Sequence, residues 1–183
     1  MISFDKFQET ITDSRKSGMN KYKDIMAQFH ENINIADSRE FQKKFNGFYR
    51  IRRNQAWQKA YYDYFDANKK NKSITFDKIL DYMYEQTGRY EASFCSKMLH
   101  TINPDMPIWD KFVLKNLGIK ISNTKDNKSE NIKSHYKEII DWFDNELKKE
   151  STKKEIEKFR KHYPGFDFSD VKILDFFLWN KRD

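Results

Sequence analysis

Cysteine, valine and long apolar runs are scarce in this sequence of 183 residues, and each shortage excludes a class of protein. The single Cys95 excludes an intramolecular disulfide framework, and His and Cys are nowhere grouped at the spacing of a zinc finger. No apolar run approaches the roughly 20 residues that a membrane span requires. The N-terminal sequence lacks the basic-then-apolar order of a secretory signal. We therefore expect a soluble protein of the cytoplasm (bacterial-type intracellular), with no membrane partner, no structural metal and no cofactor.

Strand-forming residues are also rare, which argues against a core built from β-sheet. Only Val113 and Val171 are valines, whereas aromatic residues make up 16% of the chain. Apolar residues instead recur at positions i, i+3, i+4 and i+7, the spacing that places them on one face of a helix. This spacing predicts helices in segments around residues 4–11, 22–29, 57–65, 76–83, 94–102, 112–117, 132–147 and 174–178. The predicted fold class is all-α.

Turn-forming and capping residues predict where these helices begin and end. Gly88 and Gly118 stand where a left-handed residue would end a helix. We expect a break between the first two helices at Ser17-Gly18 and a turn at Asn46-Gly47. The pair Thr152 and Glu155 has the spacing of a capping box, in which each side chain accepts a hydrogen bond from a free backbone N–H.

The length favours a single compact helical domain of residues 1–183 in two lobes, and the family resemblance given below implies a cleft between them. A chain of this size buries roughly 70% of the surface that its unfolded form exposes, so its core needs no cross-link. We expect an N-terminal lobe over about residues 1–88, a hairpin and aspartate segment over about 89–121, and C-terminal helices over about 131–181. The polar residues 122–131 read as a surface loop or hinge.

The segment from Phe41 to Tyr62 contains six basic residues and no acidic one, so it carries +6 of the total net charge of +7. Lys and Arg neutralise phosphates, and aromatic faces stack on unpaired bases. We expect the phosphate contacts to come from Arg50, Arg52, Arg53, Lys43 and Lys44. The alternative is a solvated basic face that covers an aromatic core.

The segment from Glu91 to Gly118 combines a lysine, a loop with two prolines and an aspartate. Lys97 lies in the predicted helix of 94–102, and Asp110 directly precedes the short apolar helix of 112–117. A carboxylate at a helix N-terminus is held rigidly, and the dipole and free N–H groups there favour its charged form.

This order of residues resembles the helix-hairpin-helix DNA glycosylase superfamily. Lys97 falls at the position of the hairpin lysine, and Pro107-Ile-Trp-Asp110-Lys-Phe-Val113 is similar to the segment that supplies the family's catalytic aspartate. The resemblance covers roughly residues 88–118. Ser93 and Cys95 stand where the family's hairpin has glycines, and the stretch between Lys97 and Asp110 is several residues shorter than in the family.

The resemblance implies a DNA-binding base-excision enzyme, acting as a monomer on a duplex with an extruded base. Asp110 would stabilise the sugar cation that forms as the N-glycosidic bond breaks, and Lys97 would attack C1′ in a bifunctional enzyme. The target base would be a damaged host base or a modified base in foreign DNA, flipped out of the duplex. The candidates for stacking on it are Trp57, Tyr61, Tyr90 and Trp109.

Simpler roles stand beside each of these assignments. Asp110 would serve only as an N-cap, Lys97 would be an exposed helix lysine, and His100, three residues further on, would be a structural histidine instead of a proton carrier. The alternative function is a non-catalytic nucleic-acid-binding helical module that kept the fold but lost the reaction. A third is a protein-interaction domain whose basic face only aids solubility.

Overall fold

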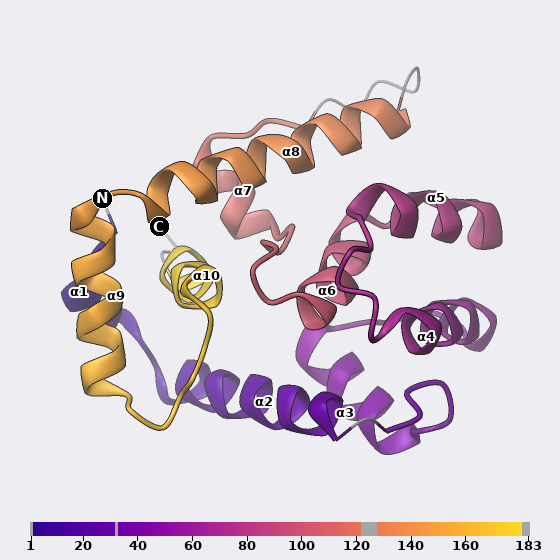
Figure 1. Ribbon diagram of the computed structural model, residues 1–183, viewed down its shortest axis with the longest axis horizontal. Coiled ribbons are helices and arrows are strands. Elements are labelled where there is room, and N and C mark those ends of the chain that lie inside the picture. Colours follow the sequence, from indigo (N-terminus) through magenta and orange to yellow (C-terminus); the bar gives the residue numbers. More distant parts are fainter. Residues whose placement is uncertain (1, 32, 122–127, 181–183) are drawn as a thin grey trace. The chain divides into compact units, whose positions relative to one another are not determined.

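The computed structural model describes residues 2–31, 33–121 and 128–180, and within these residues it contains ten helices and no strand (Figure 1). The all-α prediction is confirmed. The helices are α1 (Phe4–Thr10), α2 (Asp13–His30), α3 (Arg39–Tyr49), α4 (Gln55–Asn68), α5 (Phe76–Thr87), α6 (Ala92–Ile102), α7 (Lys111–Leu117), α8 (Lys128–Leu147), α9 (Glu150–His162) and α10 (Asp170–Asn180). None of the helices in the described ranges is long and apolar enough to cross a membrane.

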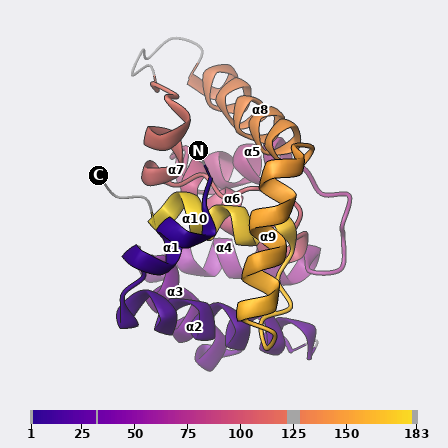
Figure 2. The same ribbon diagram turned by 90° about the vertical axis from the view of Figure 1, so that its left-hand side faces the viewer.

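The chain divides into two compact units, which differ from the lobes that the sequence suggested. The continuous unit is Lys16–Asn103 and holds α3 to α6 with most of α2. The discontinuous unit joins Met1–Arg15 to Pro104–Asp183, so that α1 lies against α9 and α10 (Figure 1 and Figure 2). The expected boundary near residue 88 falls inside the continuous unit, between α5 and α6, two helices that pack closely together. The expected cleft stays a prediction.

The apolar stripes form the helices that their spacing predicted. The stripe from Trp57 to Phe65 lies in α4, and the stripe of 76–83 lies in α5. Gly88 ends α5 with φ 66° and Gly118 ends α7 with φ 73°, both in the left-handed region where a glycine has no Cβ to strain. Ser169 precedes α10, and its Oγ accepts the Lys172 N–H at 3.1 Å.

Three of the predicted breaks and caps are wrong. Helix α2 runs through Ser17-Gly18, and the chain breaks earlier, between α1 and α2. Helix α3 runs through Asn46-Gly47 and ends at Arg50, whose φ of 56° makes it a left-handed residue with a side chain. Thr152 lies inside α9, where its hydroxyl donates to Glu146 at 2.8 Å instead of capping the helix. The expected loop of 122–131 falls mostly outside the described residues, and Lys128 already begins α8.

Each unit has its own aromatic core. In the continuous unit, Phe41, Phe45 and Phe65 are fully buried, and the rings of Phe41 and Phe45 stack 5.6 Å apart. In the discontinuous unit, the ring of Phe7 lies 5.1 Å from that of Phe177 on α10. Aromatic side chains bury large apolar areas, so a small number of ring contacts closes each core.

Candidate active site

Asp110 is the N-cap of α7, as the sequence predicted. Its Oδ1 accepts the backbone N–H of Phe112 at 2.8 Å, and its backbone is extended, as an N-cap requires. The side chain is half-buried. Within residues 2–31, 33–121 and 128–180, no ion pair engages this carboxylate, and the second oxygen, Oδ2, accepts no hydrogen bond. The carboxylate is therefore fixed in place through one oxygen only.

The loop that precedes Asp110 is held by side chains from α8 and from the start of α10. The Tyr136 hydroxyl donates to the Pro107 carbonyl at 2.8 Å, and burial raises the pKa of this tyrosine well above its ordinary value of 10. The Ser169 hydroxyl donates to the Pro104 carbonyl at 2.7 Å. Trp109 is only 6% exposed and anchors the end of the loop. Because the loop is tied at three points, Asp110 has little freedom to move relative to its unit.

Lys97 is a buried lysine on α6 of the continuous unit, and only 8% of it is exposed. Its Nζ donates to Ser93 Oγ at 2.9 Å and to the Tyr49 carbonyl at 3.5 Å. It also lies 5.1 Å from the ring centre of Phe94 and 5.5 Å from that of Tyr49, within the range of cation–π attraction. The expectation of an exposed helix lysine is therefore wrong.

Helix α6 is unusual because its polar side chains are buried as deeply as its apolar ones. Ser96, His100 and Thr101 are all fully buried. His100 Nε2 and the Tyr22 hydroxyl share a hydrogen bond of 2.9 Å, and the Thr101 hydroxyl donates to the Lys97 carbonyl at 2.8 Å. Hydrogen-bonded polar groups in a core favour one fixed arrangement of the surrounding side chains. His100 thus has the contacts of a structural histidine.

The helix-hairpin-helix resemblance falls on α5, α6 and the connection of residues 88–91 between them. The chain turns at Gly88, and both Ser93 and Cys95 lie within α6. The turn is thus ahead of the two positions where the family has glycines. Burial raises the pKa of the Cys95 thiol well above its ordinary value of 9, so this thiol stays protonated and inert.

Of the three arginines that were predicted to contact phosphate, two are exposed and one is in an ion pair. Arg50 and Arg52 are exposed, as phosphate contacts require. Arg53 forms a two-point ion pair with Glu91, with Nε to Oε1 at 2.9 Å and Nη2 to Oε2 at 3.0 Å, and its guanidinium lies 5.3 Å from the ring centre of Phe94. The hydrogen bond to Glu91 raises the pKa of Arg53. Its charge is thus already matched by a carboxylate, which leaves Arg50 and Arg52 for phosphate.

The two lysines of the basic segment lie exposed on α3. Lys44 is paired with Glu40 at 2.8 Å, one turn earlier on the helix, and Lys43 is exposed next to it. Exposed pairs of this kind are worth at most about 1 kcal/mol and exchange readily with other anions. Both lysines are therefore accessible to a polyanion.

Three of the four proposed base-stacking residues are buried. Trp57 is 5% exposed and stacks on Tyr61, which is fully buried and donates its hydroxyl to the Phe94 carbonyl at 2.9 Å. Trp109 is equally enclosed in the discontinuous unit. Tyr90 is half-buried, and its ring stacks on that of the exposed Tyr84. Tyr90 therefore remains the accessible member of the set.

Sequence reasoning missed three residues around the candidate site. Glu91, which pairs with Arg53, is 38 positions away from it, so no local pattern connects the two. Ser93, which holds Lys97, has the i, i+4 spacing that places two side chains on the same helix face, and this signal was available. Tyr22, the partner of His100, is 78 positions away.

The candidate residues do not all belong to one unit. Lys97, the arginines and Tyr90 belong to the continuous unit, whereas Asp110 belongs to the discontinuous one. Within the described part of the chain, no group of three or more His, Cys, Asp or Glu side chains is placed to hold a metal ion. Comparisons with protein-family models, with curated proteins and with solved structures found no match to this chain.

Proposed function

We propose that this protein is a DNA N-glycosylase in which Asp110 is the catalytic carboxylate. The observation that supports this most directly is the state of Asp110, with one oxygen bound to the Phe112 N–H and the other without a partner among the described residues. A residue that served only as a cap would need no second oxygen, and Ser or Asn would cap as well.

The reaction would break the bond between C1′ of the sugar and the nitrogen of the base. The base leaves with the bonding electron pair and takes up a proton, and positive charge develops on C1′ and the ring oxygen. The Asp110 carboxylate would stabilise this charge and orient a water whose oxygen then bonds to C1′. Such stabilisation is large only when the carboxylate is held in place in advance, which the ties at Pro104, Pro107 and Trp109 provide.

Lys97 would act in a bifunctional version of this reaction. Its neutral amine would attack C1′ as the base departs, and loss of a proton and ring opening would give a Schiff base. The burial of Lys97 supports this role, because desolvation disfavours a charged amine. Its donation to Ser93 and to the Tyr49 carbonyl favours a structural role instead. We therefore assign base release to Asp110 alone and leave Lys97 to the trapping experiment below.

The DNA backbone would be bound by the exposed cations of the 41–62 segment. Arg50 and Arg52 present planar guanidinium groups that bind phosphate through two hydrogen bonds. Lys43 and Lys44 add charge on α3. Arg53 contributes indirectly, since its pair with Glu91 fixes the chain next to Arg52.

The experiment that tests this function incubates the protein with DNA duplexes that carry a panel of altered bases and detects free base by mass spectrometry. Asp110→Asn keeps the helix cap but loses the charge, so it should abolish base release while leaving thermal stability nearly unchanged. Asp105→Asn, in the same loop, is the matched control and should stay active. Base release by Asp110→Asn would remove Asp110 from the mechanism.

Borohydride trapping tests the role of Lys97. A trapped protein–DNA adduct that forms with the wild type and is lost in Lys97→Met would identify Lys97 as the nucleophile. Base release without an adduct would identify a monofunctional enzyme that uses water. Thermal unfolding of Lys97→Met separates loss of chemistry from loss of fold.

The second candidate function is a nucleic-acid-binding module without catalysis. It is favoured by the two hydrogen bonds that already engage Lys97 and by the burial of Trp57, Tyr61 and Trp109, which cannot stack on a flipped base where they lie. Duplex binding with a steep dependence on salt, but with no base released from any substrate in the panel, would establish this alternative. An absence of duplex binding at low salt would leave the third reading, a protein-interaction domain.

A further inference from the structure

Two connections of the continuous unit are joined at its surface by an ion pair. One connection, residues 50–54, links α3 to α4, and the other, residues 88–91, links α5 to α6. Arg53 of the first and Glu91 of the second form the two-point pair described above, in which 12% of the Glu91 side chain is exposed. Arg52 and Tyr90 are the sequence neighbours of these two residues, so the ion pair ties the connection that carries Arg52 to the one that carries Tyr90.

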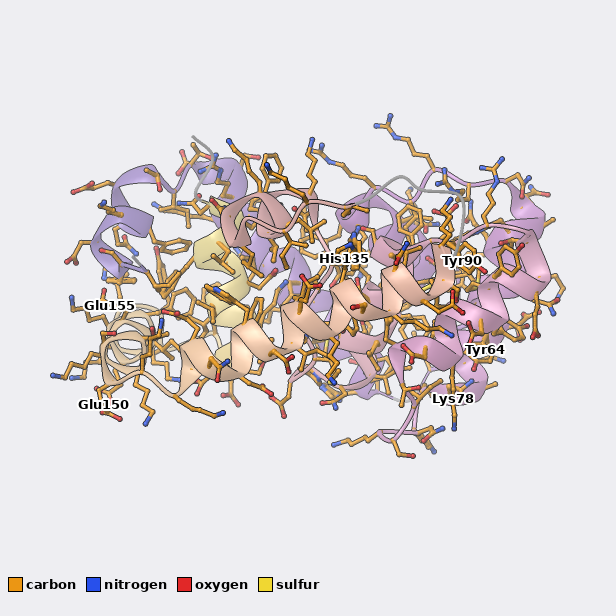
Figure 3. All side chains as sticks on the ribbon, turned by 90° about the horizontal axis from the view of Figure 1, so that it is seen from above. Tyr64, Lys78, Tyr90, His135, Glu150 and Glu155 are labelled. Carbon is orange, nitrogen blue, oxygen red and sulfur yellow. The ribbon has the colours of Figure 1, made fainter. Side chains whose placement is uncertain are left out.

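A stack of two tyrosines extends from this junction. The rings of Tyr84 and Tyr90 lie 4.1 Å apart with only 6° between their planes, an almost parallel arrangement. Tyr84 is 43% exposed, and with Ile121 it is one of the two exposed large hydrophobic residues among those that the structure describes. The pair therefore combines a nearly parallel ring stack with an aromatic residue that is accessible to solvent. Tyr90, on the segment that joins α5 to α6, is labelled in Figure 3.

The charges around the stack favour an anionic partner. Arg89 is exposed directly before Tyr90, and Arg50 and Arg52 are exposed on the connection that Arg53 ties to it. The Glu91 carboxylate is neutralised by Arg53. Glu85, next to Tyr84, and Asp81, three residues before Tyr84 on α5, are the opposing charges. Flat aromatic faces among arginines are typical of surfaces that bind unpaired nucleotides, because every base has a π-face and every nucleotide a phosphate.

We propose that Tyr84 and Tyr90, together with Arg52 and Arg89, form a stacking platform for an unpaired stretch of single-stranded DNA. A base extends the tyrosine stack on the open face of Tyr84, and the arginines bind the flanking phosphates. This deepens the proposed function, since it rests on DNA as the bound polyanion, but it does not depend on base release. The protein then has a preference for DNA with unpaired bases over an intact duplex.

The test measures the binding of a fluorescently labelled dT oligonucleotide by anisotropy, beside a duplex and an abasic strand of equal length. The abasic strand keeps every phosphate and lacks the bases, so the difference between the strands isolates stacking. Tyr84→Ala combined with Tyr90→Ala should weaken dT binding about 5- to 150-fold per stacked base and leave abasic binding unchanged. Tyr84→Phe and Tyr90→Phe keep the rings and should bind as the wild type does.

Variants of Arg89, Arg52 and Glu85 test the phosphate contacts separately from the stacking. Arg89→Ala and Arg52→Ala should each reduce the slope of log K against log salt by about 0.7 on both single strands, because each removes one phosphate contact. Glu85→Gln should tighten binding to both strands. Equal slopes for these variants and the wild type would overturn the phosphate assignment.

The matched control is the second tyrosine pair of the same unit. Tyr64 on α4 and Tyr82 on α5 stack 3.8 Å apart at 16°, and both are half-buried. Tyr82→Ala should leave dT binding intact. Loss of binding as large as that of Tyr84→Ala, or equal affinity of the wild type for dT and abasic strands, would overturn the platform. Tighter binding of an RNA strand would overturn the assignment to DNA.

The outcomes separate this inference from the proposed function. Asp110→Asn should bind dT normally while it releases no base. Base release from a duplex by a protein without dT binding would leave the glycosylase standing and end the platform. Selective dT binding without base release from any substrate would support the platform and end the glycosylase. Thermal unfolding of the double tyrosine variant shows whether its fold is intact.

Discussion

Replacing Phe7 by alanine should destabilise the discontinuous unit strongly, although Phe7 lies close to the N-terminus. Its ring packs against Phe177 on α10 at 5.1 Å and against Phe159 on α9 at 5.9 Å, and only 4% of the residue is exposed. Its carbonyl also accepts the Asn180 side-chain amide at 3.3 Å. Phe7, together with Phe4 of the same helix, therefore closes the core between the last two helices.

The magnitude follows from the size of the cavity that the substitution leaves. Removing a buried phenylalanine ring costs about 3–5 kcal/mol, since the lost transfer free energy and the unfilled volume add. This is a large share of the roughly 5–15 kcal/mol by which a domain is stable. Phe7→Leu keeps most of the apolar volume and should cost less than about 1.5 kcal/mol. The exposed Ile121→Ala, in the same unit, should change stability by about 0.5 kcal/mol or less.

Urea unfolding combined with hydrogen exchange measures both the size and the place of this effect. Phe7→Ala should lower the unfolding midpoint and reduce amide protection in α9 and α10 more than in α4. A loss below about 1 kcal/mol, or equal losses for Phe7→Ala and Ile121→Ala, would refute the reasoning. It would show that α1 contributes little to the core.

The remaining predictions concern two glycines, a carboxylate and an ion pair. Gly88→Ala should lower the free energy of unfolding by about 1 kcal/mol, because φ is 66° there. Gly47→Ala, inside α3, should raise it by about 0.5–1 kcal/mol. Thermal melts of the two variants measure both changes. Burial opposes ionisation of the Glu155 carboxyl, but the hydrogen bond from the Phe4 N–H and the ion pair with Lys158 lower its pKa. Stability should therefore fall as the pH drops below about 4.5, and it should fall less steeply in Glu155→Gln. Parallel acid-unfolding curves for the wild type and the variant would contradict this. A double-mutant cycle on Arg53 and Glu91 should give a coupling of about 1 kcal/mol that shrinks with salt; a coupling of zero would mean that the pair does not hold the two connections together.

Local patterns in the sequence predicted the helices well. The stripes in α4, α5 and α8 needed only apolar spacing, and Gly88 and Gly118 needed only the missing Cβ. Asp110 was identified as an N-cap because its signal, an aspartate before an apolar helix, is local too. Each of these features depends on neighbours within one or two turns.

The predictions that failed depended on partners in other helices or connections of the fold. Ser17-Gly18 reads as a break, yet packing carries α2 through it. Thr152 has the spacing of a cap, yet its hydroxyl donates a hydrogen bond to Glu146 of the preceding helix. The sequence predicts Arg53 as a phosphate ligand because its ion-pair partner, Glu91, is 38 positions away and no local pattern reveals it. It predicts Trp57 as a base-stacking residue because the burial of Trp57 depends on contact with α6. Residue type and local spacing carry no information on such contacts.

The pairing of α1 with α9 and α10 has a consequence for how the protein is made. Helix α1 packs against helices that begin at Glu150, so its partners are made only after the whole continuous unit. Phe4 and Phe7 therefore stay exposed or transiently covered until α9 and α10 have been made. The continuous unit has all its residues in one stretch and can close while the ribosome is still adding the others. Helix α1 is thus made before the continuous unit but can be locked in place only after it.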